Sequence, residues 1–334
     1  MRILTPKMSL TSVTNKKKIF FAVAFITMLV ITFFPKLKDT NWHTEEMKVC
    51  HKVDWGKSIS LEFTNSSRNS ELFLKSGNTH LKKQNLSILQ LPYGIKGNEV
   101  LINKILDLIP ADMPKSIHRL PCKTCVVIGN GYILKNSSLG AKINTYDVVI
   151  RINNGPIRGF EKDVGNKTTL RLFYPESAIA NPSREDNLDT LHVFVPFKVG
   201  DIQWLKTILY HEPAFLQGFW KLPPSAFRTN SSNFRLLNPY YMHQAAKDFL
   251  KLSPLQRGHQ PTTGFLAIIM ALNYCDQVHI AGFGYPFNDL NGLIHYYDQR
   301  NMKTMSGPEH NVGHEDVCLR RLAHLGAIKY LTDL

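Results

Sequence analysis

Cysteine is scarce in this chain of 334 residues, which holds five. Cys122 and Cys125 form a single C-x-x-C pair, and a four-thiolate zinc site would need a second such pair. Five cysteines allow at most two disulfide bonds with one thiol left over. Structural disulfides are therefore the preferred interpretation, and they indicate an oxidising compartment. The five are Cys50, Cys122, Cys125, Cys275 and Cys318.

A complete glycine fingerprint for dinucleotide binding is also missing. Gly129-Asn130-Gly131 follows a predicted strand, but position 134 is Leu where a third glycine is required. The next predicted strand ends in residues 151–154, "RINN", where an acidic residue would bind the ribose. NAD is therefore not expected. Two alternatives stay open: an ordinary structural turn, or a tight turn whose backbone N–H groups and Asn130 amide face a nucleotide.

Acidic residues are outnumbered, with 26 Asp and Glu against 40 Lys and Arg, which gives a formal net charge of +14. Such an excess suits an anionic partner. It also has a simpler explanation, because many of the lysines lie in the first 90 residues, where they keep polar segments soluble. No nucleic-acid-binding module is recognisable and no internal repeat is evident, so a nucleic-acid partner is not expected.

Long apolar runs are rare, and the clearest is Ile19 to Phe34, "IFFAVAFITMLVITFF", which follows three lysines. Sixteen residues make roughly 24 Å of helix against a hydrocarbon core of about 30 Å, a short span that suits a thin membrane of the secretory pathway. A cleaved signal peptide is the alternative, but no small-residue cleavage pattern follows. We predict a type II layout: cytoplasmic tail 1–18, transmembrane signal anchor 19–34, luminal stem 35–88 and folded domain 89–334.

Glycosylation sequons support the luminal assignment. Five N-x-S/T triplets occur, and they are modified only in the secretory pathway. The candidate asparagines are Asn65, Asn85, Asn136, Asn166 and Asn230.

Beyond position 91 the pattern alternates between strands and helices. A mainly parallel α/β sheet is expected, with its ligand at the carboxyl ends of the strands. Strands are predicted within 125–131, 146–154, 168–175, 191–197 and 277–285, and helices within 201–210 and 261–275.

The helix predicted within 261–275 opens with "PTTG". Thr262 or Thr263 suits the N-cap, and Gly264 lets a ligand approach the exposed N–H groups, where the positive end of the helix dipole favours an anion. Capping alone would explain the same residues.

The polar segment 295–315, "HYYDQRNMKTMSGPEHNVGHE", raises the question of a metal site. His310 and His314 are four residues apart, and Glu315 could complete a ligand set. Asn311, however, is a good N-cap, so His310 would precede the helix and His314 would lie in its first turn. That geometry is poor for shared ligation, and no metal site is expected.

Four segments together resemble the sialyl motifs of animal sialyltransferases. "CKTCVVIGNGYILKNSSLGAKINTYDVVIRINNGPIRGFEKDVGNKTTLRLFYPES" resembles the large motif and "QPTTGFLAIIMALNYCDQVHIAGFGY" the small one. "HYYDQ" resembles the third motif and "HNVGHE" the very small H-x-x-x-x-E motif. They occur in the family's order, and the resemblance runs from Leu91 to the C-terminus. "LPYG", "GFWK", "IHYY" and "GAIK" are similar to the β-galactoside α2,3 branch and, within it, to its fourth subtype.

The resemblance implies a Rossmann-like, GT-A-variant catalytic domain in a Golgi membrane protein. It implies transfer of sialic acid from CMP-sialic acid to the 3-hydroxyl of a terminal β-galactose on glycoproteins or glycolipids, by direct inverting displacement. No cofactor is expected, because the chain has no D-x-D carboxylate pair with which to hold a metal on a diphosphate. The single phosphate would instead be stabilised by His295 and by Thr262, Thr263 and Gly264 at the helix end.

The same resemblance assigns the remaining site residues. His310 is the expected general base and Glu315 its supporting acid, since a histidine titrates near neutrality. His314 falls at a variable position of the motif and is expected at the surface. The further donor-binding residues implied are Asn130, Asn153, Tyr174 and Ser177.

The resemblance also pairs Cys125 with Cys275 and Cys50 with Cys122. It leaves Cys318 as an inert thiol on an apparent helix. Two rival functions stay open: a sialyltransferase making α2,6 or α2,8 links, and a catalytically silent sugar- or nucleotide-binding membrane protein.

Overall fold

The computed structural model describes residues 50, 52–53, 59, 63, 71–76, 86–252, 260–305 and 310–332. The predicted anchor, Ile19 to Phe34, and most of the predicted stem lie outside them. Within the described ranges no helix combines the length and apolar character needed to cross a bilayer.

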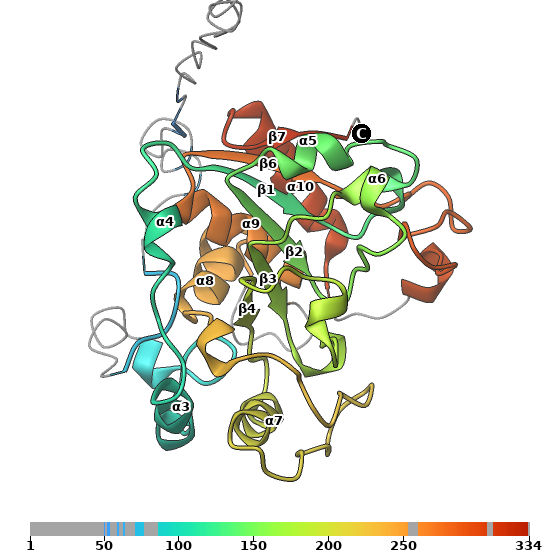
Figure 1. The fold of residues 1–334 in the computed structure, drawn as a ribbon. Helices are drawn as coiled ribbons and strands as arrows, with labels where there is room; N and C mark the ends of the chain where they lie inside the picture. The colour runs from blue at the N-terminus through green and yellow to red at the C-terminus, as the bar shows by residue number, and fades with distance from the viewer. Residues whose placement is uncertain are drawn as a thin grey trace, which may run out of the picture. The chain divides into compact units, whose positions relative to one another are not determined.

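A seven-stranded sheet forms the centre of the fold, with the order β5-β4-β3-β2-β1-β6-β7 (Figure 1). Every neighbouring pair is parallel, which confirms the predicted α/β class with a parallel sheet. The strands are β1 Thr124–Ile128, β2 Val148–Ile152, β3 Leu170–Phe173, β4 Leu191–Phe194, β5 Phe234–Leu236, β6 Gln277–Ala281 and β7 Lys329–Tyr330.

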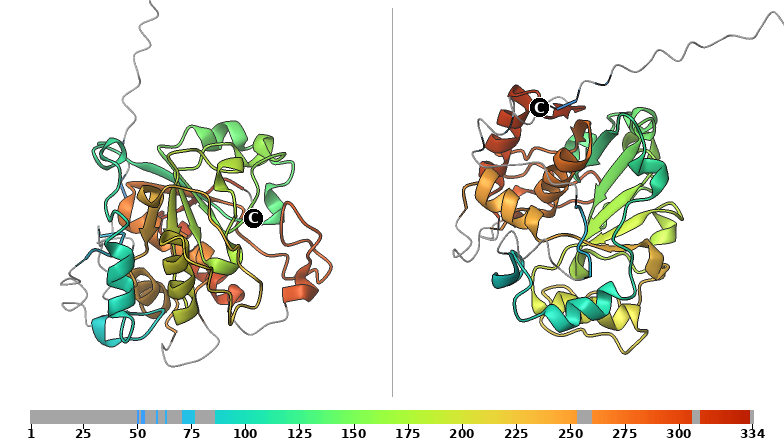
Figure 2. Two further views of the ribbon diagram at one scale, coloured as in Figure 1. Left: turned by 60° about the horizontal axis from the view of Figure 1, so that its bottom comes forward. Right: turned by 90° about the vertical axis from the view of Figure 1, so that its left-hand side faces the viewer.

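Helices cover both faces of this sheet, the orange and red ones on one side and the green ones on the other (Figure 2). The α-helices are α3 Glu99–Leu106, α4 Lys115–His118, α5 Gly140–Asn144, α6 Glu161–Val164, α7 Val199–Leu209, α8 Tyr240–His243, α9 Thr263–Tyr274 and α10 Val312–His324. A π-helical segment, Gln244–Phe249, continues α8, and short 3₁₀ turns span Leu86–Ile88, Tyr132–Leu134, Pro175–Ser177, Pro182–Arg184, Ser231–Asn233 and Met302–Met305.

Alternate residues of the buried central strands serve opposite faces. Cys125 and Val127 of β1 pack in one core cluster with α9, whereas Val126 and Ile128 pack in a second cluster with residues of α5 and α6. All residues of α9 are buried, so other parts of the fold cover this helix on every side. A strand buried on both faces reads as a continuous apolar run, which explains why the central strands were predictable.

A third core cluster fills the β4 and β5 edge, where helices α3 and α7 pack together. Trp204 of α7 is fully buried against Phe173 and Phe194, and its indole N–H donates to the carbonyl of Pro224 at 2.9 Å. The aromatic side chains therefore join α7 to the strands that precede it.

The folded body begins earlier than the predicted boundary at residue 89. One compact unit spans Cys50–Leu334, and Leu72 to Leu74 are buried beside β5. The N–H of Leu74 donates to the carbonyl of Leu236 at 2.8 Å, and Phe73 bridges Leu237. The predicted stem 35–88 therefore includes residues that pack against β5. The sequence did not indicate this contact, because the short apolar run is flanked by polar residues.

The cysteines occur as the two pairs that the resemblance implied. Disulfides join Cys50 to Cys122 and Cys125 to Cys275, with Cα–Cα distances of 5.8 and 6.0 Å. Cys318 is a free thiol, and burial raises its pKa to about 12.

The predicted glycosylation sites fall into two groups. Asn136, Asn166 and Asn230 are exposed, so an attached glycan would meet solvent at each of them. Asn65 and Asn85 lie outside the described residues.

Candidate active site

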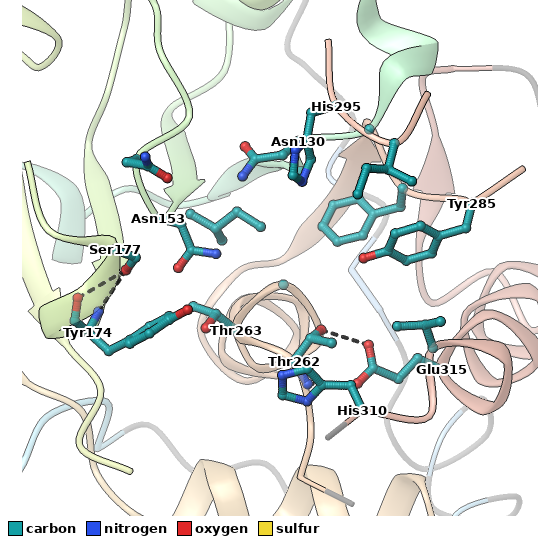
Figure 3. Close-up of a pocket in the computed structure, with 18 of the residues that line it drawn as sticks. Asn130, Asn153, Tyr174, Ser177, Thr262, Thr263, Tyr285, His295, His310 and Glu315 are labelled. Atoms are coloured by element: carbon teal, nitrogen blue, oxygen red, sulfur yellow. Dashed lines mark hydrogen bonds between the residues drawn. The ribbon is translucent and has the colours of Figure 1, made fainter. Parts of the chain in front are cut away.

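A cavity of about 730 Å³ opens at the carboxyl ends of the central strands. Every residue that the sequence predicted as catalytic or donor-binding lines it, although these residues come from six separate segments (Figure 3). They are Asn130, Asn153, Tyr174, Ser177, Thr262, Thr263, Gly264, His295, His310 and Glu315.

The turn after β1 packs directly against the end of β6. The N–H groups of Gly129 and Gly131 donate to the carbonyls of Ala281 and Gly282 at 2.8 and 2.9 Å. A Cβ on Gly129 would lie 2.3 Å from the Gly282 oxygen, so close backbone packing requires a glycine there. Close backbone packing thus explains the glycines, while Asn130 between them lines the cavity.

His295 is held beside Asn130 by backbone pairing between distant segments. The N–H of Tyr296 donates to the Asn130 carbonyl at 3.1 Å, and His295 bridges Gly131 in antiparallel fashion. These contacts explain why a residue of the third motif reaches the turn of the large motif.

A carboxylate lies behind the His295 ring. Nδ1 of His295 is 2.9 Å from Oδ2 of Asp298, and the ring stacks on Tyr297 with the planes 7° apart. Because a carboxylate only accepts, Nδ1 carries a proton, and the negative charge of Asp298 lies directly behind the ring. Nε2 is left to meet an anion in the cavity.

The N-terminus of α9 forms another wall. Thr262 is the N-cap, and its Oγ1 accepts from the N–H of Phe265 at 3.1 Å. In the described part of the chain no hydrogen bond uses the N–H groups of Thr263 and Gly264, as expected for the first turn of a helix. A Cβ on Gly264 would lie 3.0 Å from the Phe283 ring, so glycine keeps this approach open.

Glu315 binds Thr262 rather than His310. Its Oε1 accepts from the N–H of Thr262 and its Oε2 from the Thr262 hydroxyl, each at 2.7 Å. Burial raises the pKa of Glu315 to about 7, while the two hydrogen bonds from Thr262 oppose that rise. Glu315 therefore anchors the N-cap of α9, which differs from its expected place beside the base.

His310 is oriented by a backbone carbonyl. Its Nδ1 lies 2.8 Å from the carbonyl oxygen of Gln260. Since a carbonyl oxygen only accepts, Nδ1 is the protonated nitrogen and Nε2 of a neutral ring is free to accept a proton. His310 is exposed at the rim of the cavity, which leaves room for an acceptor molecule.

Asn153 and Tyr174 complete the wall opposite α9. Asn153 follows β2 with φ of 53°, and its buried Oδ1 has no hydrogen-bond partner within the described residues. Ser177 Oγ donates to the carbonyl of Tyr174 and accepts from the Tyr174 N–H, both at 3.1 Å. The "YPES" segment is therefore a closed turn, with Tyr174 edge-on to Phe197.

Sequence reasoning missed a lysine at this end of the cavity. The Lys198 ammonium pairs with buried Glu176 at 2.8 Å and buried Asp201 at 2.7 Å, and it lies over the ring of Phe219. Lys198 lies in the short segment between β4 and α7, so the rule that ligands meet the carboxyl ends of parallel strands could have identified it.

Two predictions concern side chains outside the cavity. His314, expected at the surface, is half-buried in the first turn of α10, and its N–H donates to Oδ1 of Asn311 at 3.0 Å. The prediction of Asn311 as N-cap is confirmed.

Of the described residues, Cys50, Cys122 and Asp276 come within metal-ligand distance of one another, but the two sulfurs are bonded in a disulfide and offer no thiolates.

Comparison with known sequences places this geometry in a family. The pattern of glycosyltransferase family 29 (sialyltransferase) matches residues 73–327. The chain belongs to this sialyltransferase family.

Named relatives agree with that assignment. The sialyltransferase described here is 46% identical over 323 residues to rat CMP-N-acetylneuraminate-beta-galactosamide-alpha-2,3-sialyltransferase 4, covering 93% of this chain and 96% of the rat protein. The human protein of the same name is 46% identical and covers 86% of this chain and 88% of its own. Mouse type 2 lactosamine alpha-2,3-sialyltransferase is 43% identical over 69% of this chain and 71% of its own.

A solved structure shares the fold of this sialyltransferase. A mammalian sialyltransferase in complex with Gal-beta-1-3GalNAc-ortho-nitrophenol superposes with a TM-score of 0.62 at 25% identity, covering 80% of this chain and 93% of that one. The seven-stranded parallel sheet with flanking helices is thus the architecture of a known member.

Proposed function

We propose that this enzyme transfers sialic acid from CMP-sialic acid to the 3-hydroxyl of a terminal β-galactose on a glycoprotein or glycolipid. Relatives named as α2,3-sialyltransferases, two of which match nearly the whole chain, support the linkage. The observation that carries the proposal is one cavity that combines anion-binding groups, the α9 N-terminus and His295, with a second histidine, His310, whose Nδ1 is fixed by a backbone carbonyl.

The donor phosphate binds between α9 and His295. The N–H groups of Thr263 and Gly264 lie in the first turn, at the positive end, of a twelve-residue helix. His295, backed by Asp298, supplies a cationic donor for the departing phosphate. Asn130 and Asn153 contact the nucleotide, and Tyr174 and Ser177 lie near the donor.

His310 acts as the general base. The oxygen of the galactose 3-hydroxyl attacks the anomeric carbon of sialic acid, and its proton passes to Nε2 of His310. The bond from the anomeric carbon to the phosphate oxygen breaks, and CMP departs with the electron pair. A single in-line displacement inverts the β-linked donor to an α-linked product, so no covalent enzyme intermediate forms.

The reaction proceeds without a metal ion. The sequence lacks a D-x-D pair, and the leaving group is a single phosphate whose charge the α9 N-terminus and His295 stabilise. We expect EDTA to leave the initial rate unchanged. A reproducible loss of rate that manganese restores would contradict this part of the proposal.

The enzyme is a Golgi protein with a single membrane span and a luminal body. The apolar run 19–34, preceded by basic residues, supports an uncleaved anchor with a cytoplasmic tail 1–18. A luminal body agrees with the exposed sequon asparagines 136, 166 and 230 and with two disulfides. Of the predicted stem 35–88, the part before Cys50 keeps that assignment.

Product analysis tests the function. Detergent-solubilised full-length protein is given labelled CMP-sialic acid with Galβ1-4GlcNAc and Galβ1-3GalNAc acceptors, and the product linkage is determined with linkage-specific sialidases. An α2,3 product is expected. An α2,6 or α2,8 product would contradict the proposed α2,3 linkage, whereas CMP binding without any transfer would indicate a catalytically silent binding protein.

A further inference from the structure

A buried ion pair lies behind the wall that carries Asn153. Nε of Arg171 donates to both carboxylate oxygens of Asp186 at 2.9 and 2.8 Å, and Nη2 donates to Oδ1 at 2.6 Å. The two side chains are 3% and 1% exposed, so neither charge meets solvent. His192, 4.0 Å from Asp186, adds no charge, because burial lowers the His192 pKa to about 4.

The third nitrogen of the Arg171 guanidinium reaches forward to the cavity loop. Nη1 donates to the carbonyl oxygens of Asn153 at 2.8 Å and Gly155 at 3.1 Å. Asn153 and the next residue, Asn154, line the cavity, and Asn153 has the left-handed φ of 53°. A non-glycine residue rarely holds this backbone conformation without support from its surroundings.

The same loop is fitted against Asn130. A Cβ on Gly155 would lie 2.3 Å from Oδ1 of Asn130, so the loop backbone occupies the space beside that amide. A shift of Gly155 would therefore disturb both asparagines assigned to the donor.

The neighbouring acid holds the other end of the loop. Oε2 of Glu185 accepts from the N–H groups of Ile157 and Arg158 at 2.7 and 3.0 Å. Consecutive acids, Glu185 and Asp186, thus fix the segment 153–158 at both ends, one directly and one through Arg171.

We propose that Arg171 and Asp186 are positioning residues for the nucleotide donor, acting through the carbonyls of Asn153 and Gly155. This inference rests on the proposed function, because it takes Asn153 and Asn130 as donor contacts. A buried ion pair alone is weak evidence for stability, since well-packed apolar residues often replace one without loss. The pair's distinguishing feature is that the loop carbonyls depend on it.

The decisive variant replaces the whole pair by apolar residues, Arg171→Met together with Asp186→Leu, in the full-length enzyme. It removes both buried charges, so thermal unfolding should stay near that of the wild type. We expect about a tenfold rise in the KM for CMP-sialic acid and in the Kd for CMP, because the loop loses two hydrogen bonds. The KM for the galactoside acceptor should stay within about twofold.

Arg171→Lys provides a second variant if the double variant does not fold. Lysine keeps the ion pair with Asp186 but lacks the planar fork that reaches both carbonyls, so the same donor-specific rise is expected. The matched control is Arg235→Lys, a buried arginine of β5 that donates to the carbonyls of Asp112, Ser232 and Phe234. It should lose stability with no change in donor KM.

The outcomes separate the two proposals. A folded variant with donor KM and CMP affinity within about twofold of the wild type would overturn the positioning role. An equal rise for Arg235→Lys would do the same, since it would mark a general effect of buried arginines. If the wild type neither binds CMP nor transfers sialic acid, the proposed function itself has failed.

Discussion

Two histidines line the same cavity, and they differ in what supports them. His295 has the carboxylate of Asp298 behind Nδ1 at 2.9 Å, whereas His310 has the neutral carbonyl of Gln260 at 2.8 Å. Both supports fix the tautomer, but only Asp298 places a negative charge behind its histidine ring. The cavity therefore has one imidazole suited to hold a departing anion and another suited to take a proton.

The surroundings of the two rings deepen this contrast. His295 is partly buried and stacked on Tyr297, whereas His310 lies exposed at the rim. A group that binds a fixed donor benefits from a rigid, partly dry setting, while a base for the acceptor hydroxyl has to meet a second substrate that enters from solvent. We expect substitutions on the two walls to affect different kinetic constants.

The largest effect should come from His310→Ala. Removal of the proposed general base should lower kcat by about 10³-fold and leave the Kd for CMP within about twofold. Steady-state rates with saturating acceptor and a CMP titration measure the two quantities. Near-normal turnover would refute the assignment of His310 and with it the contrast between the walls.

Glu315→Gln should change the pH dependence of stability. The pKa of Glu315 is about 7 in the folded enzyme against a usual 4.5, so its contribution is fully present below about 4.5 and is lost as pH rises through about 7. The loss is on the order of 3 kcal/mol, which the uncharged variant avoids. Tyr285 and Cys318 nearby stay neutral throughout, since burial raises the pKa of each to about 12.

Thermal unfolding of wild type and Glu315→Gln over about pH 5 to 8 measures this difference. The wild type should lose stability relative to the variant as pH rises. Parallel curves would show that the carboxylate is not the group that ionises in this range.

Asp298→Asn should have a smaller effect, confined to the anion-binding wall. Asparagine can still accept a hydrogen bond from Nδ1 of His295 but brings no charge, so the kcat/KM for CMP-sialic acid should fall about tenfold. His295→Asn should exceed it, because it removes the imidazole as well. A rise in the acceptor KM with unchanged donor constants would contradict a role of Asp298 in donor binding.

The central fold was predictable because its strands are buried on both faces. β2, β3, β4 and β6 fall within the predicted ranges, as does α9, whereas β1 begins one residue early, at Thr124, and most of α7 is covered. β5 and β7, of three and two residues, carry no pattern long enough to detect. The same limit hid Leu72 to Leu74, which are ordered by pairing with the β5 edge rather than by their own sequence.

The sequence identified residues that line the cavity, but it did not identify their hydrogen-bond partners. The motifs name Glu315 and His310 five positions apart, which suggested a direct pair. In the structure Glu315 turns to Thr262 and His310 to Gln260, both from the segment that precedes α9. Hydrogen bonds between segments 50 residues apart in sequence leave no local pattern. Asp298 belongs to the "HYYDQ" motif, but the motif alone did not indicate its contact with His295.

The smallest effect should come from His314→Ala, which tests how narrowly the base is defined. His314 lies in the first turn of α10, only four residues from His310, but it does not line the cavity. Its described hydrogen bond to Asn311 uses the backbone N–H, which alanine retains, so the α10 cap should persist. We expect kcat and both KM values within about twofold of the wild type. A loss approaching that of His310→Ala would mean that the proton passes through both rings, and the mechanism would then need a relay in place of a single base.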